Sequence, residues 1–153
     1  MSDPMYIADY DELIREVLAS GGEFRLYPRG TSMLPLIRQG RDSVSLRQLD
    51  RSPRKYDILF YQRHDGSYVL HRVRAVTPEG LILWGDNQYR LEYGVQNAQI
   101  IGYAARIFRD DREVDIDGLV YRLWLWLWQY RPMRRVLLPI VYHLRKVKFY
   151  AEN

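Results

Sequence analysis

The sequence predicts a mainly β domain with a short amino-terminal helix and a helical tail at the carboxy-terminal end. Short runs rich in β-branched and aromatic residues, separated by turn residues, fill most of the chain, and helical spacing is confined to its ends. The length of 153 residues is that of about one domain. We therefore expect an N-terminal helix over residues 1–22, a β domain over 23–118 and a basic, tryptophan-rich tail over 119–153.

The amino-terminal helix is expected over residues 9–20. Asp9 is placed as its N-cap and Glu12 lies at the capping-box offset. One side carries the apolar residues Leu13, Ile14, Val17 and Leu18. Gly21 and Gly22 follow, and such glycines commonly end a helix.

Six runs in the β domain read as strands, and they cover residues 24–29, 42–46, 57–62, 67–76, 80–84 and 99–108. Asp65-Gly66 and the reversal at 77–80 are turn sequences, so they predict two hairpins. These hairpins would place the strand 67–76 between two neighbours in one sheet. The acidic segment 109–118 predicts an exposed loop with room for a short strand.

Positive charge gathers in the tail. The formal net charge of +4 divides into −2 for residues 1–118 and +6 for 119–153. Apolar positions recur at helical spacing after Pro132, but the longest uncharged run is far below the roughly 18–20 residues that span a bilayer.

Two explanations of the tail stay open. Residues 119–148 could bind an anionic membrane surface as an interfacial amphipathic helix pair, or they could pack on the β domain or on a second copy. Nucleic acid is a weaker candidate, because the continuous apolar face fits lipid or protein better than bases. The sequence does not define the oligomeric state.

Several classes of protein are excluded or disfavoured by composition. The absence of cysteine excludes disulfide scaffolds, cysteine nucleophiles and thiolate metal sites. His64, His71 and His143 could form a metal site only if distant segments converged, so we expect no metal and no cofactor. The acidic start lacks an apolar signal segment, which predicts a cytoplasmic location, including a peripheral one on the inner face of the membrane.

Three short segments contain residue types that suit nucleophilic catalysis. Ser32 lies in a glycine-flanked turn, His71 lies on one face of a predicted strand, and Asp86 lies in a Gly-Asp-Asn turn. Each alone has an ordinary structural explanation: a turn serine, a core histidine and a turn aspartate. Together they supply a hydroxyl nucleophile, an imidazole base and a carboxylate that orients the imidazole.

The order of these segments resembles the signal peptidase and LexA-type serine peptidase superfamily over residues 24–108. The G-x-S-M-x-P pattern around Ser32, the run 57–61 and the Gly-Asp-Asn turn carry the resemblance. It implies a coiled β-sheet domain and endopeptidase activity on an extended peptide. It assigns Ser32 as the nucleophile, His71 as the general base and Asp86 as the orienting acid.

The base position departs from the members that use lysine. No lysine lies between Lys55 and Lys146, and the position holds His71 followed by Arg72, which resembles the Ser-His subgroup. An ordinary histidine, with a pKa of about 6.5, is already largely neutral at pH 7.

The resemblance also extends to the oxyanion and substrate-binding positions. Because Gly30 stands two residues before the nucleophile, the oxyanion hole should use backbone N–H groups, chiefly that of Ser32. Gly30 and Thr31 belong to the expected substrate-binding turn, and Met33 and Pro35 shape the turn and the floor of the pocket. A substrate would add a strand to a sheet edge, with small residues before the scissile bond.

The favoured function is processing of a leader or signal-type peptide at the cytoplasmic face. The alternative is a LexA-like regulatory module that cleaves itself, or that binds peptides without catalysis. About 22 residues precede the β domain, too few for a helix-turn-helix, which disfavours a repressor.

Overall fold

The computed structural model describes residues 7–129, which form two compact units with a boundary between Val114 and Asp115. The first unit contains the 3₁₀ helix η1 (Ile7–Tyr10), α1 (Asp11–Ala19), β1 (Phe24–Leu26), β2 (Ser43–Arg47), β3 (Ile58–Gln62), β4 (Tyr68–Thr77), β5 (Gly80–Trp84), β6 (Leu91–Val95), the 3₁₀ helix η2 (Asn97–Gln99), β7 (Ile100–Arg109) and β8 (Arg112–Glu113). The second contains α2 (Leu119–Gln129). The chain is therefore mainly β, as predicted.

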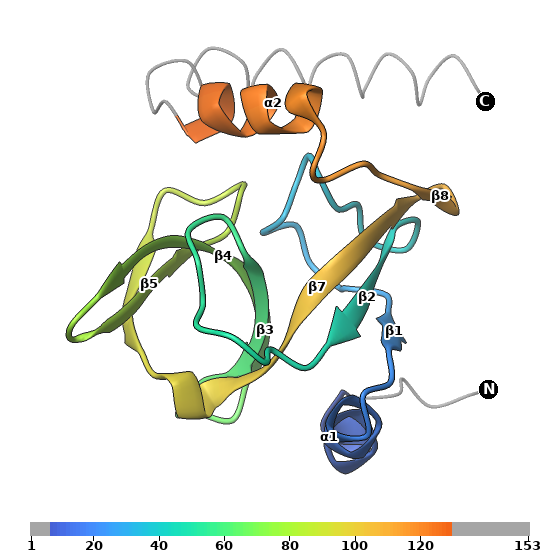
Figure 1. The fold of residues 1–153 in the computed structure, drawn as a ribbon, viewed down its shortest axis with the longest axis vertical. Coiled ribbons are helices and arrows are strands. Elements are labelled where there is room, and N and C mark those ends of the chain that lie inside the picture. Colours follow the sequence, from blue (N-terminus) through green and yellow to red (C-terminus); the bar gives the residue numbers. More distant parts are fainter. Residues whose placement is uncertain (1–6, 130–153) are drawn as a thin grey trace. The chain divides into compact units, whose positions relative to one another are not determined.

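The strands of residues 7–129 belong to one antiparallel sheet. Its order is β1-β2-β7-β3-β4-β5-β6, and β8 pairs with β7. Each of the six predicted strands overlaps an observed one, although β1 ends at Leu26 and not at residue 29. The position of β4 between β3 and β5 is confirmed. Figure 1 shows β3, β4 and β5 curving around on the other side of β7 from β1 and β2. The curvature encloses a core, with these buried members: Leu59, Tyr61, Val73, Leu81, Leu83 and Val95.

The two predicted hairpins form for the expected reasons. Asp65 accepts hydrogen bonds from the N–H and the hydroxyl of Ser67, and Gly66 adopts φ +84°, a conformation that favours glycine. The second turn closes with Thr77 opposite Gly80. Strand β4 is therefore held on both edges.

Two details of the sequence prediction differ from the structure. Helix α1 begins at Asp11 after η1, with Tyr10 at the N-cap and no side-chain cap hydrogen bond, so the assignment of Asp9 as the cap is wrong. Strand β6 was not predicted, because Glu92 and Gly94 interrupt its pattern of apolar residues. The short strand expected within 109–118 is β8.

Helix α1 packs its apolar side on the sheet. Ile14 and Leu18 are buried, and each such side chain contributes about 1.5–3 kcal/mol relative to exposure. A Cβ at Gly102 of β7 would lie 2.8 Å from Cδ1 of Leu18, so a glycine is needed for this close packing. The helix ends at the predicted glycines, where the Gly22 N–H donates to the carbonyl of Val17.

The tail begins with the expected helix. Along α2, Tyr121 stacks on Trp124, which in turn stacks on Trp128. The helical pattern after Pro132 lies outside the described residues. Within residues 7–129, no helix has the length and apolar character needed to cross a membrane.

Candidate active site

Ser32 lies in the loop between β1 and β2. The loop is ordered by backbone hydrogen bonds from Leu34 to Thr31 and from Ile37 to Met33, at 3.2 and 3.0 Å. Met33 and Ile37 are buried, while Ser32 is partly exposed. The turn thus combines a packed floor with a serine open to a ligand.

A group of charges fixes the far end of this loop. The fully buried carboxylate of Asp42 accepts hydrogen bonds from the backbone N–H and the guanidinium of Arg38. Burial would raise the pKa of Asp42, but the hydrogen bonds and charge of Arg38 lower it overall. Arg109 also donates to the carbonyl of Pro35. These anchors were not predicted from the sequence.

The Gly-Asp-Asn turn packs directly on Ser32. The Asn87 N–H donates to the Ser32 carbonyl at 2.7 Å, and a Cβ at Gly85 would lie 2.7 Å from that same carbonyl oxygen. Two of the segments singled out in the sequence are therefore in contact, and glycine at position 85 permits it.

Ser32 and His71 line one cavity of about 210 Å³, together with Gly30 and Met33. Thr31 and Pro35, which were also expected at the substrate-binding turn, are not among the described residues that line it. Within residues 7–129, the Ser32 hydroxyl forms no hydrogen bond, so it is not bonded to His71. The structure brings the predicted nucleophile and base to one cavity without joining them.

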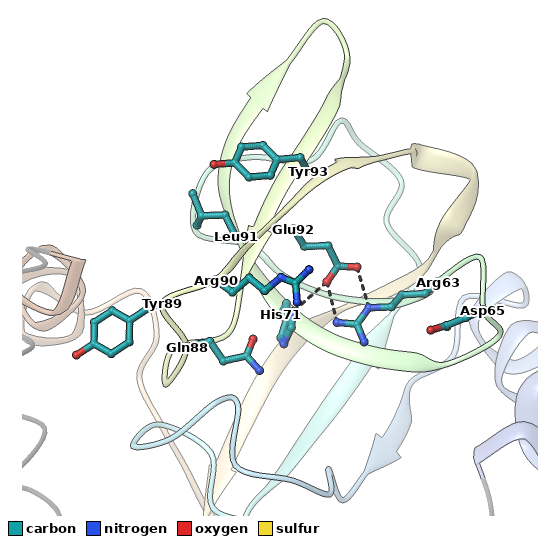
Figure 2. A pocket seen from close by; sticks show the side chains of 9 residues that line it. All are labelled: Arg63, Asp65, His71, Gln88, Tyr89, Arg90, Leu91, Glu92 and Tyr93. Carbon is teal, nitrogen blue, oxygen red and sulfur yellow. Dashed lines mark hydrogen bonds and ion pairs between the residues drawn. The ribbon is translucent and has the colours of Figure 1, made fainter.

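A hydrogen-bonded network holds the other side of the imidazole. Nδ1 of His71 lies 3.2 Å from the Tyr61 hydroxyl, which donates to Glu92 at 2.7 Å. Arg63 donates twice to the Glu92 carboxylate, at 2.8 Å each. Figure 2 shows Glu92 between Arg63 and His71. A carboxylate oxygen of Glu92 lies 3.6 Å from Nδ1 of His71.

This network assigns the tautomer of His71. Because the Tyr61 proton points to Glu92, the Tyr61 oxygen accepts from Nδ1–H of His71. Nε2 then carries the free lone pair. The network therefore leaves a basic nitrogen available for proton transfer.

The environment also sets the charge of these groups. Burial lowers the pKa of His71 to about 4, although the charge of Glu92 opposes this, so the imidazole is neutral at pH 7. The hydrogen bonds from Arg63 lower the pKa of Glu92, while burial raises that of Tyr61. A neutral imidazole thus stands beside an ionised carboxylate and a protonated phenol.

Asp86 forms an ion pair with Arg72, and its charge also acts on His71, whose pKa it raises. Its two oxygens accept from Nε and a terminal nitrogen of Arg72 at 2.8 and 2.7 Å, and both side chains are buried. His71 and Arg72 are consecutive in β4, so they point to opposite faces of the strand. An orienting role of Asp86 toward His71 stays a prediction, whereas the observed contacts place Glu92 in that network.

Tyr61, Arg63 and Glu92 were missed as site residues. Tyr61 lies in the run 57–61 and, two residues after Leu59, on the same face of β3. This pattern indicated its place in the strand but not its hydrogen-bond partner. Glu92 gave no signal, because β6 itself was not predicted.

Backbone donors near Ser32 are also defined. The Gly30 N–H donates to the side chain of Gln39 at 2.8 Å and is therefore engaged. The Ser32 N–H has no acceptor among residues 7–129. This N–H suits an oxyanion.

In the described part of the chain, no group of three or more His, Asp or Glu side chains is arranged to hold a metal ion. His143, one of the three histidines considered above, lies outside that part.

No family model, curated protein or solved structure matches the chain. The function proposed next depends on the geometry of the site and on the resemblance of the sequence segments.

Proposed function

We propose that the protein is a serine endopeptidase that cleaves a leader or signal-type peptide, with Ser32 as nucleophile and His71 as general base. The observation that carries this proposal is the cavity shared by Ser32 and His71. The buried imidazole is neutral at pH 7, and its Nδ1 side is occupied by Tyr61. Such an imidazole suits proton abstraction from a hydroxyl.

The reaction follows from these positions. Nε2 of His71 takes the proton of Ser32 Oγ as the oxygen attacks the peptide carbonyl carbon, and the Ser32 N–H stabilises the resulting oxyanion. The imidazolium then gives this proton to the leaving amine, and an acyl ester on Ser32 remains. Water attacks the ester, with His71 again taking and returning a proton, and the acid product leaves.

Glu92 is the orienting acid in this proposal. Its charge reaches His71 through the Tyr61 hydroxyl, and it would stabilise the imidazolium that forms during the reaction. Arg63 keeps Glu92 ionised. Asp86 would instead fix the turn that contacts Ser32, through its ion pair with Arg72.

The finer fold assignment, to the signal peptidase and LexA-type superfamily, is part of the same proposal. It is supported by the curved antiparallel sheet, by a serine loop between β1 and β2, and by a base on β4. The position of Gly85 against Ser32 gives the Gly-Asp-Asn turn a role consistent with that assignment.

Covalent labelling tests the proposed nucleophile and base. A fluorophosphonate should add one equivalent to the wild type, seen by intact mass, and none to Ser32→Ala. His71→Gln should label about 100-fold more slowly. Ser67→Ala and His64→Gln, which alter residues of the β3–β4 turn, are the matched controls and should label normally. Equal labelling of wild type and Ser32→Ala would end the proposal.

One observation favours a second function, peptide binding without catalysis. The Ser32 hydroxyl is not hydrogen-bonded to His71 within the described residues, although such bonds can form only when substrate binds. A wild type that binds peptides but neither labels nor cleaves them would support this alternative.

We further propose that the tail binds an anionic membrane surface, at the cytoplasmic face. Helix α2 exposes Leu119, Val120, Leu123 and Trp126, at 56–84% of their surface. The tail sequence adds a net charge of +6. Apolar side chains beside basic residues suit an interface of anionic lipid.

Vesicle flotation tests this with the full chain. The wild type should float with vesicles containing phosphatidylglycerol and less so with pure phosphatidylcholine. The double substitution Leu123→Ser and Trp126→Ser should abolish flotation, while Leu13→Ser, an exposed apolar residue of α1, should not. Absence of wild-type flotation would count against a membrane role.

A further inference from the structure

A second, larger cavity lies beside the amino-terminal helices. It has a volume of about 580 Å³ and is bounded by η1, α1, β1 and the β3–β4 turn. We name it the helix-side cavity. The residues that matter below are Ile7, Tyr10, Phe24, Leu26, Arg29 and Tyr68.

The wall of the helix-side cavity is largely apolar. Ile7 and Tyr10 come from η1, Phe24 and Leu26 come from β1, and Tyr68 starts β4. Apolar walls with an aromatic share are typical of sites that take apolar side chains.

The helix-side cavity adjoins the candidate active site. Arg29 and Tyr68 line both this cavity and the one that contains Ser32 and His71. A peptide bound at Ser32 can therefore extend from the active site into the helix-side cavity.

The strand β1 supplies the direction of that path. It is the first strand of the sheet order and, in the described part of the chain, pairs only with β2. A peptide that extended along residues 24–30 would advance about 3.3 Å per residue. Gly30 lies beside the nucleophile, and Leu26 and Phe24 of the helix-side cavity lie four and six residues before Gly30. The peptide side chain that enters this cavity is therefore about four to six positions from the scissile bond.

We propose that the helix-side cavity is a specificity subsite for a large apolar side chain of the peptide substrate. This inference rests on the proposed peptidase function and adds to it a substrate class: peptides with Leu, Phe or Trp several residues from the cleaved bond. The amino-terminal helices thereby form part of the substrate-binding surface.

A library of internally quenched peptides tests the subsite. The wild type should cleave peptides with Leu, Phe or Trp at one of these distant positions about tenfold faster than matched peptides with Asp there. Ile7→Glu and Tyr10→Ala should reduce this ratio to about one and leave fluorophosphonate labelling unchanged. Leu13→Ala is the matched control, because Leu13 is an exposed apolar residue of α1 that does not line the cavity. Cleavage without a distant apolar preference would overturn the inference.

A binding measurement separates failure of the subsite from failure of the peptidase proposal. Adding an apolar library peptide to ¹⁵N-labelled Ser32→Ala should shift the amides of Gly66 and Tyr68, which line the helix-side cavity, and Ile7→Glu should remove the shift. If the wild type cleaves nothing, the peptidase proposal fails and these shifts still decide the subsite. If deletion of residues 1–6, rather than added peptide, moves the two amides, the chain itself fills the cavity and the inference is overturned.

Discussion

The Tyr61 hydroxyl and Nδ1 of His71 lie 3.2 Å apart on neighbouring strands, β3 and β4. Tyr61 pairs with Val69 and His71 pairs with Leu59, so the two side chains are diagonal neighbours on one face of the sheet. Because Tyr61 also donates to Glu92, the contact fixes one tautomer of the imidazole. The sheet register, rather than a loop, thus places the candidate base.

Tyr61→Phe tests this positioning. The variant removes the acceptor of the His71 Nδ1–H, so turnover should fall about ten- to hundredfold. The hydrogen-bonded Nδ1–H resonance of His71 should also disappear from the NMR spectrum. Tyr103→Phe, which packs against the same core, should retain both activity and resonance. An unchanged resonance in Tyr61→Phe would contradict the assigned network.

The pH dependence of activity should reflect the buried environment of His71. The base must be neutral, and its pKa is lowered to about 4. The rate of labelling at Ser32 should therefore stay level from about pH 8 down to pH 5 and fall to half near pH 4. Rates measured in steps of half a pH unit check this, with His64→Gln as the control. A half-maximal rate near pH 6.5 would indicate a solvent-exposed base.

The same shift predicts a pH dependence of stability. Well above pH 6.5 the imidazole is neutral in both the folded and the unfolded chain, so its ionisation no longer affects stability. As the pH falls towards 4, the unfolded chain binds the proton first, and the folded state loses about 2–3 kcal/mol of stability. Urea unfolding of wild type and His71→Gln at pH 7.5 and 4.5 should show this loss in the wild type and a smaller one in the variant. Equal losses would contradict the low pKa.

The sequence predicted the strands better than the contacts between side chains. Alternation and turn residues are local signals, so β4 and its two hairpins were predictable. The hydrogen bond between Tyr61 and Glu92 joins residues that are 31 positions apart in sequence. The pattern of β6 was too weak to predict that strand. Ser32 and His71 were identified through the resemblance of their segments. The ion pair of Asp86 with Arg72 could not be predicted in the same way, because it depends on Arg72 pointing to the opposite face of β4 from His71.

Variants of Asp86 and Glu92 separate structural from orienting roles. Asp86→Ala leaves Arg72 buried without its carboxylate partner, so the free energy of unfolding should fall by about 3–5 kcal/mol. Asp11→Ala, which breaks an exposed pair with Arg15, should cost less than about 1 kcal/mol. For the fraction that folds, Asp86→Asn should shift the pH profile of labelling less than Glu92→Gln does, because the charge of Glu92 acts more strongly on the pKa of His71. The reverse pattern would restore Asp86 as the orienting acid.

The contact between Gly85 and Ser32 predicts that a single methyl group disturbs the nucleophile. In Gly85→Ala, the new Cβ would lie 2.7 Å from the Ser32 carbonyl oxygen and 3.0 Å from Ser32 Cβ, so the turn must move. Because catalysis is sensitive to displacements of about 1 Å, the labelling rate should fall by about tenfold or more. Gly40→Ala is the matched control in the same loop. It is strained by its φ of +74° and meets no neighbour, so it should cost about 1 kcal/mol of stability and leave the labelling rate unchanged. Loss of activity in Gly40→Ala but not in Gly85→Ala would show that the loop's conformation matters and that its contact with the Gly-Asp-Asn turn does not.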